Sequence, residues 1–199
     1  MKSKIKILEE IARKNDGILK TKNIEEAGLS RIYIKDFVDQ EILVKESQGV
    51  YSLKSDLVDE YKVLQIRSEK LIYSFGTALY LLGLSDRIPM ILDLTFPQGY
   101  NVSRIKKDKS NLHFHFVPKH LWELGRIDVV TPFGATVQAY DKERSICDLI
   151  SQKKNVDIQL YTHAIKEYFS NEPNISKIMN YSKLLGVEKQ VRNYIEVLL

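Results

Sequence analysis

The first 53 residues contain three closely spaced helical patterns followed by two short β-type runs. The elements expected from these patterns are helices over Lys4–Lys14, Thr21–Ala27 and Arg31–Gln40 and strands over Ile42–Lys45 and Val50–Leu53. Gly28-Leu29-Ser30 supplies the turn before the third helix, and Glu46–Gly49 joins the two strands. Helix, helix, turn, helix and hairpin in this order predict a winged helix-turn-helix, a small fold that commonly binds duplex DNA.

A polar and acidic stretch, Lys54–Lys62, separates this segment from the rest of the 199-residue chain. A chain of this length can form one large domain or two smaller ones. The change in composition favours two, a winged helix-turn-helix domain over residues 1–56 and a second domain over residues 57–199. The fold class expected is α+β, because the second domain is mixed α/β and ends in helices.

Beyond this boundary, helix and strand patterns are interspersed before three helices close the chain. Strands are expected over Ile91–Phe96, Leu112–Val117, Ile127–Thr131 and Thr136–Tyr140. Helices are expected over Ser74–Leu82, Asp141–Ile150, Asp157–Phe169, Ile175–Leu185 and Glu188–Leu198. The last two strands are predicted to form a hairpin around the turn Pro132-Phe133-Gly134.

The charge of the chain is only mildly basic. The formal net charge is +4, from 30 basic and 26 acidic residues. Up to Leu53 there are 10 basic and 9 acidic residues, so the segment expected to bind DNA is nearly neutral. Nonspecific DNA affinity grows with the number of phosphates that cations neutralise. The affinity of this protein therefore depends on where its few cations lie.

Two features indicate a protein of the cytoplasm. Cys147 is the sole cysteine, which excludes an internal disulfide and fits a reducing compartment. No apolar stretch approaches the roughly 20 residues of a membrane span, and Met1–Lys4 leads into an amphipathic helix without an apolar signal core. We therefore expect no membrane partner, and no motif in the sequence requires a cofactor.

The third predicted helix carries most of the side chains expected to read DNA. Burial of Ile34, Phe37 and Val38 turns its opposite face outward. The expected DNA-binding residues are Lys20, Thr21, Ser30, Arg31, Ile32, Tyr33, Lys35, Asp36, Lys45 and Gln48. Arg31 and Lys35 suit phosphates or guanine edges, and the amides at the start of the helix favour a phosphate.

Other members of this set have narrower expected roles. Ile32 suits a thymine methyl group, and Asp36, an acid that faces a polyanion, needs a cytosine amino group as its partner. Thr21 and Ser30 are expected to cap the second and third helices. The hairpin of the two predicted strands would be the wing of this fold. Its turn after Lys45 is not basic, so the wing should contribute weakly to DNA binding. The alternative is that the three helices serve protein contacts, as they do in some winged helices.

The densest basic run lies in the second domain, over Arg104–Lys109. We interpret it as a solvated loop, which is what most short basic runs are. The alternative is an additional phosphate-contacting patch that extends the DNA footprint, with contacts from Arg104, Lys106, Lys107 and Lys109.

The second domain contains histidines and carboxylates, which are residue types that bind metal ions or act in catalysis. His113 and His115 share one face of a predicted strand, but no Cys-x-x-Cys or His-Glu-x-x-His spacing accompanies them. We therefore interpret them as ordinary strand histidines and expect no metal site. The carboxylates that suggest a nuclease are Asp93, Asp141, Glu143 and Asp148. Asp141 and Glu143 instead fit a helix start, and no nucleophile–base pair accompanies them, so we expect no catalytic residues and no enzyme activity.

Several blocks of the sequence resemble the AbiEi-type antitoxins. Gly28–Arg31 leading to Gly49–Tyr51 is similar to their N-terminal domain, and Ser74–Arg87 carries the strongest similarity. The remaining similar blocks are Asp59–Tyr61, Leu64–Arg67, Pro97–Tyr100, Thr131–Gly134 and Tyr140–Leu149. The chain departs from the family in its wing, Lys45–Gln48, which is commonly more basic, and at Gln40–Ile42, where a glycine is often seen.

The resemblance implies a bacterial antitoxin from a two-gene toxin–antitoxin or abortive phage infection operon. In such proteins the N-terminal winged helix represses the operon's own promoter at inverted repeats. The C-terminal domain neutralises a nucleotidyltransferase-like toxin, without a stable antitoxin–toxin complex. The protein would be a monomer in solution, and two copies would bind the double-stranded operator cooperatively, one per half-site.

Two other functions remain open at this point. In one, the protein interacts with or modifies the toxin, and DNA binding is secondary. In the other, the protein is a DNA-cleaving enzyme that depends on Asp93 or Asp141.

Overall fold

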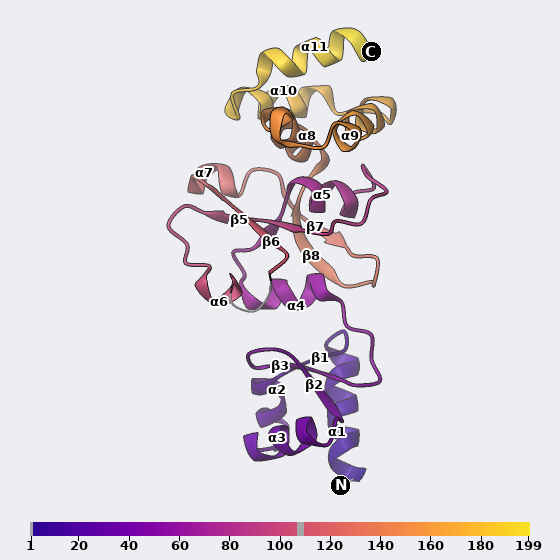
Figure 1. The fold of residues 1–199 in the computed structure, drawn as a ribbon, viewed down its shortest axis with the longest axis vertical. Coiled ribbons are helices and arrows are strands. Elements are labelled where there is room, and N and C mark those ends of the chain that lie inside the picture. The colour runs from indigo at the N-terminus through magenta and orange to yellow at the C-terminus, as the bar shows by residue number, and fades with distance from the viewer. Residues whose placement is uncertain (1, 107–109) are drawn as a thin grey trace. The chain divides into compact units, whose positions relative to one another are not determined.

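The computed structural model describes residues 2–106 and 110–199. The chain divides into two compact units, an N-terminal unit of residues up to Arg67 with Phe133–Ala135, and a C-terminal unit of Ser68–Pro132 with Thr136–Leu199. Figure 1 colours the chain from its N-terminus to its C-terminus and labels the elements of each unit. The sequence-based division after residue 56 stays a prediction.

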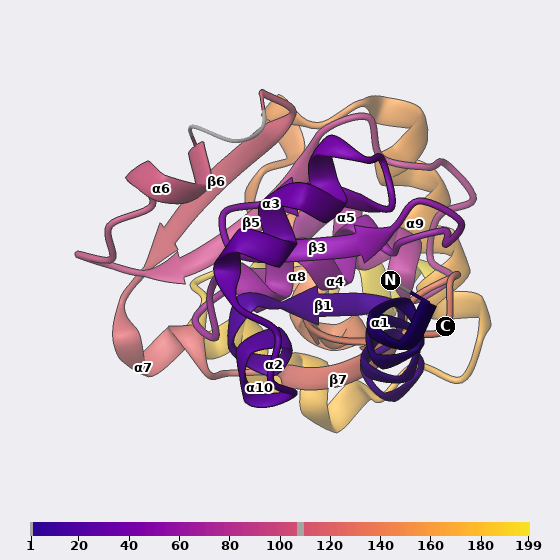
Figure 2. The same cartoon turned by 90° about the horizontal axis from the view of Figure 1, so that it is seen from below.

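The N-terminal unit contains the three predicted helices and the two predicted strands. Its elements are α1 (Lys2–Lys14), β1 (Ile18–Lys20), α2 (Thr21–Glu26), α3 (Arg31–Asp39), β2 (Leu43–Ser47), β3 (Val50–Leu53) and α4 (Glu60–Arg67). The strands form an antiparallel sheet in the order β1-β3-β2. Figure 2 views α1 nearly end-on and shows β1 and β3 side by side. The sequence patterns predict neither β1 nor α4, and α4 begins inside the polar stretch Lys54–Lys62.

The core of the N-terminal unit explains how α3 is oriented. Ile34 and Phe37 are 4% and 3% exposed and pack with Leu8 of α1 and Leu43 of β2, and Val38 is partly buried against the same cluster. The predicted buried stripe of the third helix is therefore confirmed. Because these side chains fix the rotation of α3, the positions between them face outward.

The C-terminal unit alternates strands and helices before a helical end. Its elements up to the last strand are β4 (Ile72–Tyr73), α5 (Phe75–Leu81), β5 (Leu92–Pro97), α6 (Ser103–Lys106), β6 (Leu112–Val117), α7 (Lys119–Trp122), β7 (Arg126–Val130) and β8 (Thr136–Tyr140). Then follow α8 (Lys142–Ser151), a short 3-10 turn (Lys153–Asn155), α9 (Ile158–Ser170), α10 (Ile175–Leu184) and α11 (Glu188–Leu198). Every helix and strand predicted for this part is present, so the mixed α+β class is confirmed.

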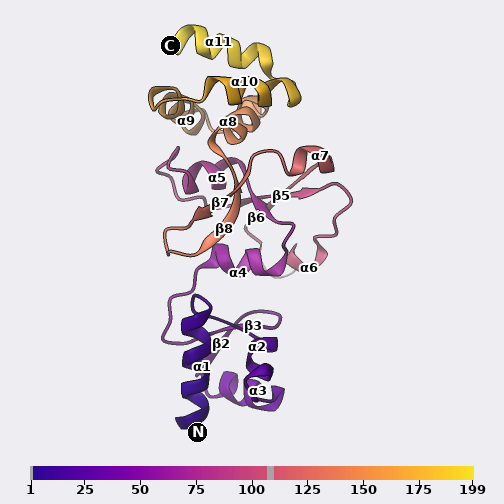
Figure 3. The same cartoon turned by 180° about the vertical axis from the view of Figure 1, so that it is seen from behind.

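The five strands form one mixed sheet in the order β6-β5-β4-β8-β7. β5 pairs with β6 and β4 with β8 in parallel, whereas β4–β5 and β7–β8 are antiparallel. Figures 1 and 3 show α8–α11 gathered on one side of this sheet, with α5 between the sheet and α8. The helices bury a shared apolar cluster that includes Leu79, Ile146, Ile165 and Ile178.

A buried arginine fixes the start of α8. Asp141 is the N-cap of α8, as expected, and its Oδ1 accepts from the backbone N–H of Arg144 at 2.8 Å. The Arg144 side chain is 1% exposed, and its Nε lies 2.9 Å from Oδ2 of Asp148. Its Nη1 donates to the carbonyl oxygens of Leu121 and Leu124 at 2.6 and 3.0 Å. These bonds join α8 to α7 and to the residues that follow it.

Replacing the guanidinium should destabilise the C-terminal unit strongly. In Arg144→Met the Asp148 carboxylate stays buried without its counter-ion, and the two carbonyl oxygens lose their donor. Removal of one partner from a buried ion pair costs about 3–5 kcal/mol. The measurement is the free energy of unfolding from urea denaturation followed by far-UV circular dichroism.

Arg192→Met is the matched control. Arg192 pairs with Glu188 one helical turn away on the exposed side of α11. Such surface pairs contribute about 0.2–1 kcal/mol, so this variant should unfold almost like the wild type. Equal losses in the two variants would contradict the structural role given to Arg144.

The single cysteine should be chemically inert in the folded protein. Cys147 is 0% exposed within the core of the helical region, and burial raises the pKa of its thiol to about 12. Because the thiolate is the nucleophile, iodoacetamide at about pH 8 should leave the native protein unmodified and label one thiol per chain in strong denaturant. Mass spectrometry reads the label directly, and rapid labelling of the native protein would contradict this packing.

Candidate nucleic-acid interface

A groove of about 480 Å³ lies between α3 and the β2–β3 hairpin of the N-terminal unit. Half of the residues predicted to bind DNA line it: Thr21, Arg31, Lys35, Lys45 and Gln48. Ile34, Val38 and Gly49 complete its floor with Tyr51 of β3. The structure thus brings together cations that lie up to 14 residues apart in the sequence. We call this feature the α3–hairpin groove.

The other half of the predicted set lies around the groove. Ile32 is 73% exposed and Tyr33 is 38% exposed on α3. Lys20, Ser30 and Asp36 are also exposed, at the end of β1, just before α3 and on α3. Each of these side chains is accessible from solvent without a change in the core of the unit.

Arg31 already has a partner within the protein. Its Nε lies 2.6 Å from Oε1 of Glu25, the fifth residue of α2. This hydrogen bond, and the charge of Glu25 behind it, raise the pKa of the exposed Arg31 guanidinium above its ordinary value. The pair makes one end of the groove electrically neutral. Sequence reasoning missed it, because helical spacing does not pair residues on two different helices.

Tyr33 also has a partner within the protein that the sequence did not indicate. The Nζ of Lys4 on α1 lies 3.1 Å from the centroid of the Tyr33 ring. A cation over an aromatic face is stabilising, by about 0.5–1 kcal/mol at an exposed site. The contact holds the ring at the edge of α3 next to α1, and it adds Lys4 to the cations near the candidate interface.

The expected caps of α2 and α3 are corrected by the structure. Lys20 occupies the N-cap position of α2, and Thr21 is the first helical residue. The Thr21 hydroxyl donates to the carbonyl oxygen of Gly49 at 3.3 Å, as does its backbone N–H at 2.9 Å. Ser30 does stand at the N-cap of α3, but its side chain makes no capping hydrogen bond. Thr21 therefore ties the start of α2 to the hairpin turn instead of capping the helix.

The hairpin brings one cation and one amide to the groove. Lys45 and Gln48 are exposed, whereas the carboxylate of Glu46 accepts from the Ser52 hydroxyl at 2.7 Å. Gly49 has a φ of +75°, a backbone conformation that suits glycine and that closes the short turn. The acid of the hairpin is thus engaged with β3, and the weak contribution expected of the wing stays a prediction.

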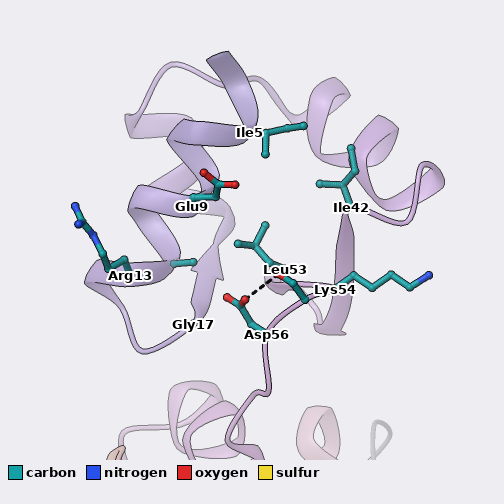
Figure 4. Close-up of a pocket in the computed structure, with 10 residues that line it drawn as sticks. Ile5, Glu9, Arg13, Gly17, Ile42, Leu53, Lys54 and Asp56 are labelled. Atoms are coloured by element: carbon teal, nitrogen blue, oxygen red, sulfur yellow. Dashed lines mark hydrogen bonds between the residues drawn. The ribbon is translucent and has the colours of Figure 1, made fainter. Parts of the chain in front are cut away.

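A second hollow of the N-terminal unit, of about 580 Å³, has a different character. Figure 4 shows it between α1 and the segment after β3. The carboxylates of Glu9 and Asp56 lie at its edge, and the cationic ends of Arg13 and Lys54 point away from it. Such a lining does not favour a phosphate, so the α3–hairpin groove is the better candidate for nucleic acid.

The remaining predicted residues lie in the C-terminal unit. Arg104 and Lys106 are exposed on α6, and Lys107 and Lys109 lie outside the described residues. The interpretation of this run as a solvated loop stays a prediction. His113 and His115 lie on β6, and both hydrogen-bond to one carboxylate oxygen of Asp93 on β5. Imidazole and carboxylate groups are the side chains that hold many metal ions.

Comparison with known proteins supports the sequence-based resemblance. Residues 6–54 match the family described as "Transcriptional regulator, AbiEi antitoxin", which confirms the expected AbiEi-type resemblance over this segment. The matched segment contains α2, α3 and the hairpin. No curated protein matches the chain.

The fold is also similar to a solved structure, that of the RV2827C protein from Mycobacterium tuberculosis. The similarity covers 89% of this chain and 70% of that protein, with a TM-score of 0.66 and 13% sequence identity. At this identity the likeness concerns the fold. Across residues 2–106 and 110–199, every helix is too short or too polar to span a bilayer.

Proposed function

We propose that this protein is a bacterial antitoxin and transcriptional autorepressor. Residues 1–56 act as a winged helix-turn-helix domain that binds inverted repeats in the promoter of the protein's own operon. Residues 57–199 counteract a nucleotidyltransferase-like toxin in the cytoplasm. The family match over residues 6–54 supports the regulatory role, and the α3–hairpin groove, with its Arg31, Lys35 and Lys45 lining, is the observation that carries the DNA-binding half.

The exposed face of α3 suits the major groove. The N-terminal end of α3 presents backbone amides and the positive end of the helix dipole, which favour a phosphate. Ile32 is 73% exposed at the second position of the helix, where its apolar side chain fits a thymine methyl group. Arg31 and Lys35, on the groove side, reach guanine edges or phosphates.

The flanks of α3 suit the DNA backbone. Lys45 and Gln48 reach a phosphate from the hairpin, and Lys20 and Thr21 do so from the start of α2. Neither Lys35 nor Lys45 has an ion-pair partner within 4.0 Å in the described part of the chain, so both charges are available to a polyanion. The number of such cations is small, and one copy therefore binds DNA weakly.

Weak binding by one copy fits an operator with inverted repeats. Two copies of a helix-turn-helix protein occupy half-sites about one helical turn apart, on the same side of the duplex. The protein is a monomer in solution in this proposal, and occupancy is cooperative on DNA. The toxin is countered separately by the C-terminal part, without a stable antitoxin–toxin complex.

Removal of the two α3 cations should weaken specific binding strongly. In Arg31→Ala/Lys35→Ala the affinity for the upstream promoter should fall at least about tenfold, because one bidentate base contact alone contributes about 1–3 kcal/mol. Loss of two phosphate-neutralising groups should also lower the salt slope of the logarithm of the affinity by about 1–2. Fluorescence anisotropy with full-length protein and promoter duplex at several salt concentrations measures both quantities.

Arg13→Ala/Lys14→Ala is the charge-matched control, since both residues are exposed at the end of α1. It changes net charge equally and should weaken binding by less than about threefold. Wild-type affinity in the α3 variant would refute the residue assignment. The α3 variant should still rescue cells from the toxin, and loss of rescue together with DNA binding would contradict separate sites for the two activities.

Neutralising Glu25 should tighten DNA binding. Glu25→Gln keeps an amide oxygen that can accept from Arg31 but removes the negative charge that competes with a phosphate. An exposed ion pair is weak and screened by salt, so the gain should be modest, at most about fivefold at low salt. The same anisotropy titration measures the effect.

Glu26→Gln is the control for this variant, because Glu26 lies next in sequence on α2 but pairs with Lys22. It should leave the affinity nearly unchanged. Weaker binding by Glu25→Gln than by the control would mean that Glu25 orients Arg31 for a base contact instead of competing with DNA.

A further inference from the structure

Two adjacent parallel strands of the C-terminal unit bring a carboxylate and two imidazoles together. Asp93 on β5 is opposite His113 on β6, and His115 follows two residues later on the same face. The Nδ1 of His113 lies 3.1 Å and the Nε2 of His115 lies 2.8 Å from Oδ1 of Asp93. The three ligand-type atoms lie within 4.8 Å of one another. We call these residues the Asp–His–His cluster.

The backbone orients the carboxylate of this cluster. The other Asp93 oxygen, Oδ2, accepts from the backbone N–H of Gly76 at 3.2 Å, and the backbone N–H of Asp93 donates to the Thr77 hydroxyl at 2.8 Å. A Cβ at Gly76 would lie 3.3 Å from Oδ2, so the close approach suits glycine. Outer contacts of this kind turn one carboxylate oxygen toward its ligand partners and are characteristic of metal sites.

A strained residue holds one imidazole in place. Phe75 has a φ of +43°, in the left-handed region that non-glycine residues rarely adopt, and its ring stacks on His115 with centroids 4.1 Å apart. A backbone in this region is strained, and such residues cluster at functional sites. Here the strain places an aromatic ring against the imidazole whose Nε2 faces Asp93.

The cluster opens into a cavity of about 290 Å³. Its walls come from the start of α5, the end of α8 and the start of α9, with Leu149, Val156 and Leu160 among the apolar lining residues. All three members of the Asp–His–His cluster line this cavity. A group bound between the three side chains would therefore have one side open to a ligand from the cavity.

We propose that Asp93, His113 and His115 bind a divalent transition-metal ion such as Zn²⁺, with a further coordination position open to the cavity. Imidazole nitrogens and a carboxylate oxygen are preferred Zn²⁺ ligands, and three protein ligands with an open position form a recurrent arrangement. Ligand atoms about 2.0–2.1 Å from a tetrahedral ion are about 3.3 Å apart, close to the observed distances of 2.8 and 3.1 Å.

This inference revises the interpretation of His113 and His115 as ordinary strand histidines. It concerns the C-terminal unit alone and does not depend on DNA binding. The competing explanation is a hydrogen-bonded cluster in which both imidazoles donate to one carboxylate oxygen. The two explanations differ in a measurable way, because a hydrogen-bonded cluster has no preference for a metal ion.

The test is a titration of untagged full-length protein, freed of metal by a chelator, with Co²⁺ as the spectroscopic probe. We expect visible d–d absorption that saturates at one ion per chain and disappears on addition of Zn²⁺. Zn²⁺ should also raise the thermal unfolding temperature, because a ligand that binds only the folded state stabilises it. Absence of both the spectrum and the thermal shift would overturn the proposal.

The variants Asp93→Asn, His113→Gln and His115→Gln separate the two explanations. Each keeps a side chain that can hydrogen-bond within the cluster but removes a metal ligand. Loss of a ligand should weaken Co²⁺ binding by more than about tenfold, since even outer contacts of metal sites are worth about 10–100-fold. His113 is the most exposed of the three, at 63% of its side chain, so His113→Gln gives a readout even where another variant fails to fold.

His120→Gln and His163→Gln are the matched controls. Both histidines are exposed, on α7 and α9, and neither belongs to the Asp–His–His cluster. They should bind Co²⁺ like the wild type. Equal Co²⁺ affinity in the cluster variants and the controls would assign the ion to another place on the surface and overturn the proposal.

Discussion

The C-terminal unit depends on one buried guanidinium. Arg144 joins the start of α8 to the carbonyl oxygens of Leu121 and Leu124, and it lies 4.2 Å from the ring of Tyr140 on β8. A Cβ at Gly125 would lie 2.7 Å from that of Arg144, so the approach of the two segments requires glycine there. Because α8 is fixed at this end, its other end is in place to form a wall of the cavity beside the Asp–His–His cluster.

The N-terminal unit depends on burial in an equally direct way. Burial of Ile34 and Phe37 fixes the rotation of α3, and helical periodicity then determines which side chains face outward. This is why the sequence predicts Ile32 and Asp36 on the outward face of α3, with Arg31 and Lys35 on its flank. The sequence does not predict which side chains pair with these residues. Glu25 approaches Arg31 from another helix, and the spacing of residues within one helix cannot predict that contact.

Length and periodicity together decided which elements the sequence could predict. Most helices and strands of five or more residues were predicted with ends within two residues, among them α8 to α11. The exception is α4, which has eight residues but whose apolar side chains do not gather on one face. The elements β1, β4, α6 and α7 have two to four residues, too few for periodicity to appear. The sequence predicts only part of the Asp–His–His cluster. Alternation along a strand places His113 and His115 on one face. Asp93, some 20 residues earlier, comes beside them only because β5 and β6 are neighbours in the sheet.

The modest charge of the α3–hairpin groove bears on how the proposed autorepressor would discriminate its operator from other DNA. Nonspecific affinity grows with the number of neutralised phosphates, and here Lys35 and Lys45 are available while Arg31 is shared with Glu25. In the proposed function, such a groove binds random duplex weakly, so base contacts contribute a larger share of the affinity. Two copies on an inverted repeat then add their base contacts, while the occupancy of the rest of the genome stays low. Weak binding by one copy is, in this proposal, a source of specificity.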